Sequence, residues 1–217
     1  MTGLIIAGRR VAAGAVRFAM LAALVSLLAG CSRTIIEDRL ATGYDPADVE
    51  QDLGFWHSLP GRAAVANDEG LHGLILLESG ADELATYGAR VAHAREKGWV
   101  SESWDEEAGF AMQRGLAARA LVKICEIEGG VVMRVFGPSE RSSLREIVYL
   151  GLMPPSTENQ TMTGEEFMGI IAKAEDYVRM RDYERAEDAK KAAPDAAEPP
   201  QGEAAEPEEN ATSSGPA

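Results

Sequence analysis

A short apolar run near the N-terminus constrains this chain more than any other feature. The run Phe18–Ala29 has no charged residue, and the first acidic residue of the chain is Glu37. Three arginines precede the run: Arg9, Arg10 and Arg17. A positively charged start, an apolar stretch and a small-residue end are typical of an export signal. The sequence therefore predicts that residues 1–30 form a signal peptide and that the body of the protein lies beyond them.

The last four residues of this stretch, Leu28-Ala29-Gly30-Cys31, resemble the lipobox of bacterial lipoproteins. In that class of protein the cysteine thiol receives a diacylglyceryl group, and cleavage leaves the cysteine as residue one. The resemblance implies a lipid anchor with Cys31 as the lipidation site. Two acyl chains bury on the order of thirty methylenes at ~0.8 kcal/mol each, so desorption is negligible. Ser32 resembles the pattern that sends such proteins to the outer membrane, so the expected location is the cell envelope, facing the periplasm or the surface.

Two other interpretations of the run stay open. An uncleaved spanning helix needs about 20 apolar residues, whereas Phe18–Ala29 has 12. Extending the run back to Val11 places Arg17 inside the bilayer, at a cost of about 2.5–3.5 kcal/mol near its centre. The other interpretation is an ordinary signal peptide followed by a chance cysteine.

The composition makes the mature protein strongly acidic. Of 21 basic residues, three are removed with residues 1–30 and no acid is, so 18 basic residues remain against 35 acidic ones, a net charge of −17. Such a surface is repelled by nucleic acid and by anionic lipid headgroups, which disfavours DNA or RNA as a partner. We expect the partners to be the membrane, through the lipid anchor, and a cell-wall polymer or an envelope protein.

Residue types that carry chemistry are few. Cys125 is the one cysteine besides Cys31 and stands among apolar residues, so we expect a buried core side chain rather than a reactive thiol. Residues 102–107 are acidic but lack the alternating ligands and central glycine of a calcium loop. The three histidines lack the spacing of metal ligands: His57, His72 and His93. The sequence predicts no catalytic centre, no metal and no cofactor.

Composition also divides the chain. Residues 31–60 are expected to form a partly packed linker with Phe55-Trp56 as packing anchors. From Glu184 onwards the chain is rich in Ala, Glu and Pro, with no aromatic or branched aliphatic residue. Such a composition cannot repay the entropy of ordering, so residues 184–217 are expected to be a disordered acidic tail. One compact domain remains, residues 61–183.

Helical periodicity dominates that domain. Apolar residues recur every three or four positions in five segments with capping or stop residues at their ends. The expected helices are Asn67 to Gly80, Asp82 to Lys97, Arg114 to Glu128, Ser139 to Leu150, and a last one that begins at Thr163. The predicted fold class is all-α, a small helical bundle.

Two details of this prediction concern the faces and the connections. The buried face of the second helix is expected to contain Leu84, Tyr87, Val91 and Ala94, with Arg90 elsewhere. Val131–Phe136 is β-branched and apolar, so it is expected to be an extended connector.

The expected helices form a repeat. Gly98-Trp99-Val100 ends one helix, and Gly151-Leu152-Met153 ends another 53 positions later. The starts of the following helices also align, Gln113 with Thr163, 50 positions later. Behind these starts Ala117, Ala120 and Leu121 match Phe167, Ile170 and Ile171, and an incomplete third copy from Asn67 places Leu71, Leu74 and Ile75 in the same positions. The unit is a helix, a Gly-apolar stop, a loop and a capped helix.

That unit resembles the S-layer homology (SLH) motif, in which a first helix ends in Gly-Trp-Ile or similar and a second begins with Thr-Arg-Ala-Glu. The likeness spans residues 82–183. The later copy keeps Thr163 and Glu166 and has Gly164 where Arg is expected, and the earlier copy keeps Arg114. Domains of that family bind cell-wall polymers, so the resemblance implies Arg114, Thr163 and Glu166 as candidate polymer-contacting residues. Thr163 and Glu166 also have the spacing of a capping box, which needs no ligand.

These features predict a non-catalytic, membrane-anchored lipoprotein whose helical domain binds wall polymer or an envelope partner. The alternative is a protein-interaction scaffold in the periplasm without glycan binding, in which the tail from Glu184 acts as a spacer. An enzyme would need convergent polar side chains in a deep pocket.

Overall fold

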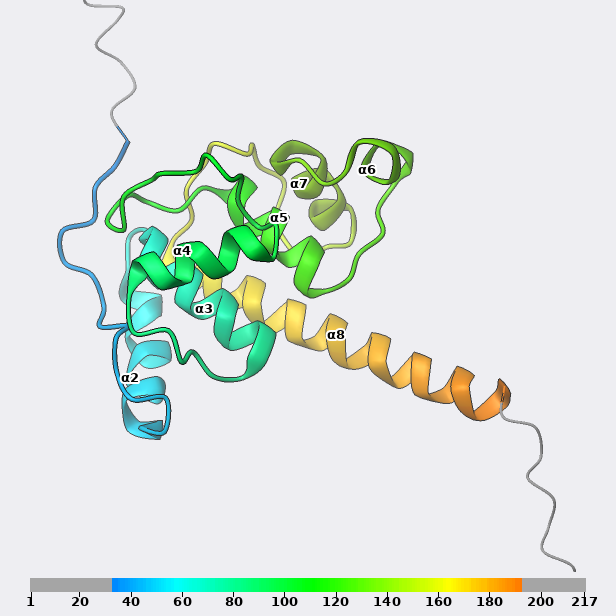
Figure 1. The fold of residues 1–217 in the computed structure, drawn as a ribbon, viewed down its shortest axis with the longest axis horizontal. Coiled ribbons are helices and arrows are strands. Elements are labelled where there is room, and N and C mark those ends of the chain that lie inside the picture. Colours follow the sequence, from blue (N-terminus) through cyan, green and yellow to red (C-terminus); the bar gives the residue numbers. More distant parts are fainter. Residues whose placement is uncertain (1–32, 193–217) are drawn as a thin grey trace, which may run out of the picture. The chain divides into compact units, whose positions relative to one another are not determined.

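The computed structural model describes residues 33–192 of the 217-residue chain. The described residues form seven α-helices, one 3-10 turn and no strand, which confirms the all-α prediction. The predicted signal peptide, Cys31 and the tail beyond Ala192 lie outside them. The elements are α2 (Val49–Ser58), η1 (Leu59–Gly61), α3 (Asn67–Ser79), α4 (Tyr87–Glu96), α5 (Arg114–Ile124), α6 (Val131–Phe136), α7 (Glu140–Tyr149) and α8 (Gly164–Ala192) (Figure 1).

The chain divides into two compact units after Tyr177, within α8. The first unit contains every other element and the core, and the described part of the second is the remainder of the helix, Val178–Ala192. Residues 184–192 are therefore helical, although the tail is predicted to begin at Glu184. The reason is that this stretch consists mainly of Ala, Glu, Lys and Arg, which are strong helix formers.

Three helices, α3, α5 and α8, begin at one place in the first unit. A short extended segment precedes each of them, and we call residues 64–66, 111–113 and 161–163 the lead-ins. The amide of Val65 donates to the carbonyl of Met162 (3.1 Å), and the amide of Met112 donates to the carbonyl of Val65 (2.8 Å). These three side chains are fully buried, one from each lead-in. The lead-ins thus form a small hydrogen-bonded hub from which three helices run.

The hub gives the repeat a structural basis. The residues that cap α3, α5 and α8 are Ala66, Gln113 and Thr163, which lie 47 and 50 positions apart. The apolar pattern of the sequence aligns Leu71 with Ala117, 46 positions later. The caps lie 47 positions apart, so that alignment is wrong by one residue. With the observed spacing, one buried branched residue occupies the same place in each helix: Leu74, Leu121 and Ile171.

Each of these three helices has a shorter helix before it in the chain, so the copy predicted to be incomplete has α2 as its first helix. Residues 49–61, within the predicted partly packed linker, form α2 and η1, and Phe55 and Leu59 are buried. The prediction that Phe55 anchors this stretch is confirmed. Within the core, α3 packs against α4 and α5, and α5 packs against α7.

The predicted stops of α4 and α7 have the same geometry. Gly98 and Gly151 both have positive φ, +70° and +75°. After α4, the amide of Trp99 donates to the carbonyl of Ala94 (2.8 Å), and after α7 the amide of Leu152 donates to the carbonyl of Ile147 (3.0 Å). Both ends are therefore Schellman motifs, in which a left-handed residue turns the chain and the apolar residue that follows is buried against the helix.

Three predicted elements differ from the structure. The helix expected to run from Arg114 to Glu128 ends at Ile124, because Glu126 adopts a left-handed conformation with φ of 51°. The second helix begins at Tyr87 rather than at Asp82, because Thr86 is its N-cap and accepts from the amide of Ala89 (3.2 Å). Val131–Phe136 is the one-and-a-half-turn helix α6 rather than an extended connector. The described residues offer no strand for it to pair with, so its β-branched composition is overridden by local bonds, such as that from the Arg134 amide to the Gly130 carbonyl (3.2 Å).

The Schellman geometry predicts opposite effects of one substitution at two glycines. Gly98→Ala should lower the free energy of unfolding by about 1–2 kcal/mol, because alanine resists the left-handed conformation. A Cβ at Gly98 meets only Lys123 Cε at 3.8 Å, so sterics add little. Gly169→Ala is the matched control: it lies inside α8 with open space around it, and the change should raise stability by about 0.5–1 kcal/mol. Urea unfolding of both variants measures this, and equal effects would contradict the assignment.

Candidate functional site

The structure brings together the three residues predicted to contact polymer. Arg114 opens α5, and its Nη2 lies 2.7 Å from Oε2 of Glu166 in the first turn of α8. The same Glu166 oxygen accepts from the amide of Thr163 (3.0 Å), and Thr163 Oγ1 accepts from the amide of Glu166 (3.1 Å). The predicted capping box is therefore confirmed, and it is joined to α5 by an ion pair. We call these three residues the Arg114 cluster.

The Arg114 cluster is satisfied largely from within. The Arg114 side chain is 7% exposed, and its Nε donates to the carbonyl of Thr161 (3.1 Å). The backbone hydrogen bond from Thr163 and the neighbouring guanidinium hold the pKa of Glu166 below its usual value, against the opposing effect of partial burial. Arg114 Nη1 is buried without a hydrogen-bond partner. Glu166 is the accessible charge of the cluster, with a side chain 40% exposed.

The first copy of the repeat contains an equivalent arrangement. Glu69 occupies in α3 the place that Glu166 has in α8, three residues after the cap, and accepts from the amide of Ala66 (2.8 Å). Arg62 Nε lies 3.5 Å from the other oxygen of this carboxylate, and the amide of Leu40 donates to it (2.7 Å). Glu69 is fully buried. In two copies of the repeat, therefore, an acid caps the helix at the hub and pairs with an arginine. The polymer-contacting role of Arg114, Thr163 and Glu166 stays a prediction.

A second polar group lies inside the first unit, around Arg90. This side chain is 1% exposed, and its Nε lies 2.5 Å from Asp82 Oδ2. Its Nη1 donates to Asp68 Oδ1 (2.9 Å) and to Thr42 Oγ1 (3.1 Å), and its Nη2 donates to the carbonyl of Thr42. Arg90 therefore ties α4 to α3, to the loop before α4 and to the chain near Thr42.

The network continues from Asp82 to the start of α2. His72 Nδ1 lies 2.6 Å from Asp82 Oδ2, and His72 Nε2 lies 2.7 Å from the Tyr44 hydroxyl. That hydroxyl also lies 3.0 Å from Asp52 Oδ1. Burial and the neighbouring Asp52 raise the pKa of Tyr44 above its ordinary value. We call the chain of contacts from Asp52 to Arg90 the buried network.

Asp82 is the ionised centre of this network. Burial alone would raise its pKa, but hydrogen bonds from His72 and Arg90, and one from the amide of Leu84, hold the pKa below its usual value. The carboxylate is therefore charged at neutral pH. A buried charge with this many donors is typical of a structural centre, and a pair of this kind is costly to break.

The sequence prediction missed the buried network. Arg90 is expected away from the buried face of its helix, but it is among the most buried side chains of the protein. A signal was present: His72 lies within the apolar spacing of α3, where a polar residue needs a buried partner. Which residue supplies that partner depends on tertiary packing. His72 therefore indicates that a buried polar group exists, but not which other residues belong to it.

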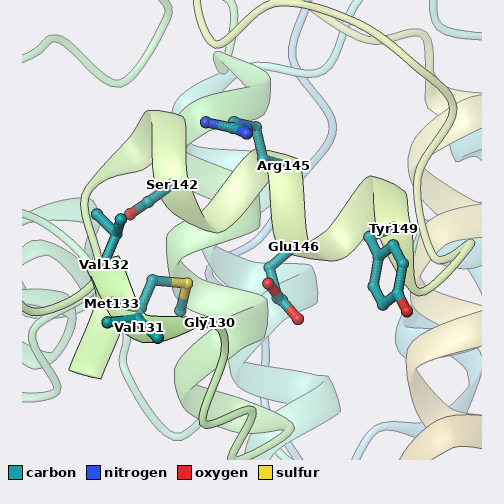
Figure 2. Close-up of a pocket in the computed structure, with 8 residues that line it drawn as sticks. All are labelled: Gly130, Val131, Val132, Met133, Ser142, Arg145, Glu146 and Tyr149. Carbon is teal, nitrogen blue, oxygen red and sulfur yellow. The ribbon is translucent and has the colours of Figure 1, made fainter.

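A hollow of about 490 Å³ lies between α6 and α7 (Figure 2). Gly130, Val131, Val132 and Met133 line it from one side, and Ser142, Arg145, Glu146 and Tyr149 line it from α7. In Figure 2 the Met133 and Glu146 side chains lie between the two helices. The valines at its rim are largely exposed, so the hollow is open to solvent and adjoins an apolar surface.

The remaining predicted site residues are placed simply. Cys125 is buried, as expected of a core side chain. Among residues 33–192, no three His, Cys, Asp or Glu side chains are grouped so that they would hold a metal ion. None of the helices in the described part of the chain is long and apolar enough to cross a membrane.

Comparison with known proteins does not assign the chain to a family. No family model, no curated protein and no solved structure matches it.

The buried network predicts very different costs for two arginine substitutions. Arg90→Met should lower the free energy of unfolding by about 3–5 kcal/mol, because it leaves Asp82 buried without its cation. Arg134→Met is the matched control, since Arg134 is also ion-paired, with Glu128 at 3.0 Å, but is 64% exposed. Its effect should stay within about 0.5 kcal/mol. Chemical unfolding of both variants measures the difference, and similar values would show that the Arg90 pair is not buried in solution.

The lowered pKa of Asp82 also predicts a pH dependence. Its carboxylate stabilises the fold above the unfolded pKa of about 4, and this contribution is lost as the pH falls through the lower folded pKa. Asp82→Asn should therefore be clearly less stable than the unchanged protein at pH 7. The difference in stability between the two proteins should become smaller as the pH falls below about 4. Thermal unfolding at pH 7 and in the acid range tests this. A gap that stays constant would contradict an ionised Asp82.

Proposed function

We propose that this protein is a non-catalytic lipoprotein of the bacterial cell envelope, anchored through Cys31, whose helical body binds an envelope component. The observation that carries this proposal is the lipobox-like sequence Leu28-Ala29-Gly30-Cys31 at the end of a positively charged and apolar N-terminal stretch. Arg33, two residues after this cysteine, is the first residue that the structure describes, and it is already part of the folded body.

The contacts at this start are extensive. Arg33 pairs with Glu106 and lies over the Phe110 ring, with Cζ 5.5 Å from its centroid. The amide of Ala111 donates to the carbonyl of Thr34 (2.8 Å), and the amide of Ile36 donates to the carbonyl of Gly109 (2.7 Å). A cleavage site downstream of Arg33 would remove these contacts, whereas the proposed cleavage before Cys31 keeps them.

For the envelope component, the first candidate is a cell-wall polymer. The SLH-like repeat supports it, and the Arg114 cluster offers Glu166 as an accessible acidic group beside a helix N-terminus. Retention of the purified protein on isolated sacculi at low salt tests this, with Glu166→Gln as the variant. Retention that Glu166→Gln weakens supports the cluster as the contact, and no retention of the unchanged protein contradicts polymer binding.

The second candidate is a protein-interaction scaffold without glycan binding. One observation favours it: the Arg114 side chain is 7% exposed, and its Nε and Nη2 already donate to Thr161 and Glu166, so little of it is accessible to a ligand. Cross-linking in cells separates the two candidates. One stoichiometric protein partner without retention on sacculi supports the scaffold.

The anchor itself gives a direct prediction. Cys31→Ala should release the protein from the membrane fraction into the periplasm or the medium, because the two acyl chains that prevent desorption are then absent. Intact-mass analysis of the unchanged protein should show a chain that begins at Cys31 and carries diacylglyceryl. Ser32→Ala is the matched control and should stay with the membranes. A Cys31→Ala protein that still sediments at full length would overturn the anchor.

A further inference from the structure

We propose that α6 is a membrane-contacting element, which docks into the interface of an anionic bilayer beside the anchored N-terminus. This inference rests on the proposed lipid anchor for its geometry. It concerns a surface that the anchor does not itself require, because α6 lies about a hundred residues from Cys31 along the chain. The inference assigns a role to the exposed apolar side chains of α6 beside the hollow.

The apolar side chains of α6 are unusually exposed. Four of its six residues are large and apolar and are between 61% and 84% exposed: Val131, Val132, Val135 and Phe136. Only Met133 of this helix is buried. Tyr149, at the end of α7 on the other side of the hollow, is 84% exposed. A contiguous exposed apolar patch of this kind marks an interaction site, and valine, phenylalanine and tyrosine suit the boundary between headgroups and acyl chains.

The charges around α6 differ from those of the rest of the body. Between Glu128 and Pro155 the chain has three arginines and three acids, so this stretch is neutral in a protein whose net charge is −14. All three arginines are exposed, namely Arg134, Arg141 and Arg145, and Arg134 pairs with Glu128 at 3.0 Å. Arginine beside exposed apolar side chains complements phosphate headgroups above the acyl region. A lipid surface of negative charge therefore fits this patch better than it fits the acidic remainder of the molecule.

The anchor limits how far the body can lie from the bilayer. Arg33 is held by Glu106, so only Ser32 separates the lipidated residue from the folded unit. Two residues span at most about 7 Å, and some face of the first unit must therefore lie on the headgroups. In Figure 1 the blue start of the described chain and α6 both reach the upper margin of the first unit. A plane that touches the start of the chain at this margin also touches α6.

The shape of α6 agrees with this occupant. It is a six-residue helix bounded by Gly129-Gly130 before it and Gly137-Pro138 after it. Met133 is its buried residue, Val132 lies beside Ser142 at the rim of the hollow (Figure 2), and Phe136 is 84% exposed. A short helix with an exposed apolar face of this kind suits the boundary between headgroups and acyl chains.

A fluorophore at position 132 tests the inference in the acylated full-length product. Val132→Cys labelled with an environment-sensitive dye provides the probe, because Cys31 is acylated and Cys125 is buried. The protein is reconstituted into vesicles of phosphatidylethanolamine and phosphatidylglycerol that contain nitroxide-labelled lipid. Val49→Cys, on α2 and 66% exposed, is the matched control site. We expect several-fold stronger nitroxide quenching at position 132 than at position 49.

Substitution of the patch provides the second arm. Adding Phe136→Ser to the labelled Val132→Cys protein should reduce the quenching at least two-fold, whereas Leu53→Ser, a 62% exposed residue of α2, should not change it. Equal quenching at positions 132 and 49 overturns the inference. A dye that is shielded from water but not quenched also overturns it, since it assigns the patch to a protein, such as a second copy of this chain.

Failure of the anchor is detected separately. Intact-mass analysis of the same preparation shows whether Cys31 is acylated. If it is acylated and position 132 stays in water, the inference fails and the proposed function stands. If it is unmodified, the anchor fails, and sedimentation of the unlabelled chain with the same vesicles decides the inference: loss of binding in Phe136→Ser supports it, and absence of binding by the unchanged chain overturns it.

Discussion

The backbone hydrogen bonds among the three lead-ins hold the first unit together. Val65 bonds to both of the other lead-ins, through its amide to Met162 and through its carbonyl to Met112. Three helices begin there, so the directions of α3, α5 and α8 are set at one point, and α4 packs against α3 while α7 packs against α5. The acids that cap α3 and α8, Glu69 and Glu166, strengthen this point because each joins a helix start to an arginine of another segment.

The buried network holds the N-terminal part of the chain to this core. Thr42 and Tyr44 are bonded to Arg90 and His72, which belong to α4 and α3. The arm that runs from residue 33 is therefore part of the folded unit rather than a tether. If the chain is anchored at Cys31 as proposed, its folded body would lie at the membrane surface, whereas a long tether would allow it to reach the wall freely.

The sequence predicted the features that depend on local chemistry. The capping box of Thr163 and the glycine stops at Gly98 and Gly151 depend on a few neighbouring residues, and they are found as expected. The helix at α6 and the burial of Arg90 were missed for one reason. Each depends on what lies next to the residue in space, and β-branched composition or helical spacing does not contain that information. For the candidate site, the sequence named Arg114 and Glu166 separately, and only the fold showed that they bond to each other.

The contact between residues 34–36 and residues 109–111 has a consequence for the order of maturation. The packed arm places the residues after Cys31 against a loop more than 70 positions later in the chain, which would restrict the access of an enzyme that modifies Cys31 and cuts before it. If Cys31 is processed as proposed, lipid transfer and cleavage take place before this arm docks. Premature folding of the body would then protect the precursor from its own peptidase, and a chaperone that delays folding would increase the yield of anchored protein.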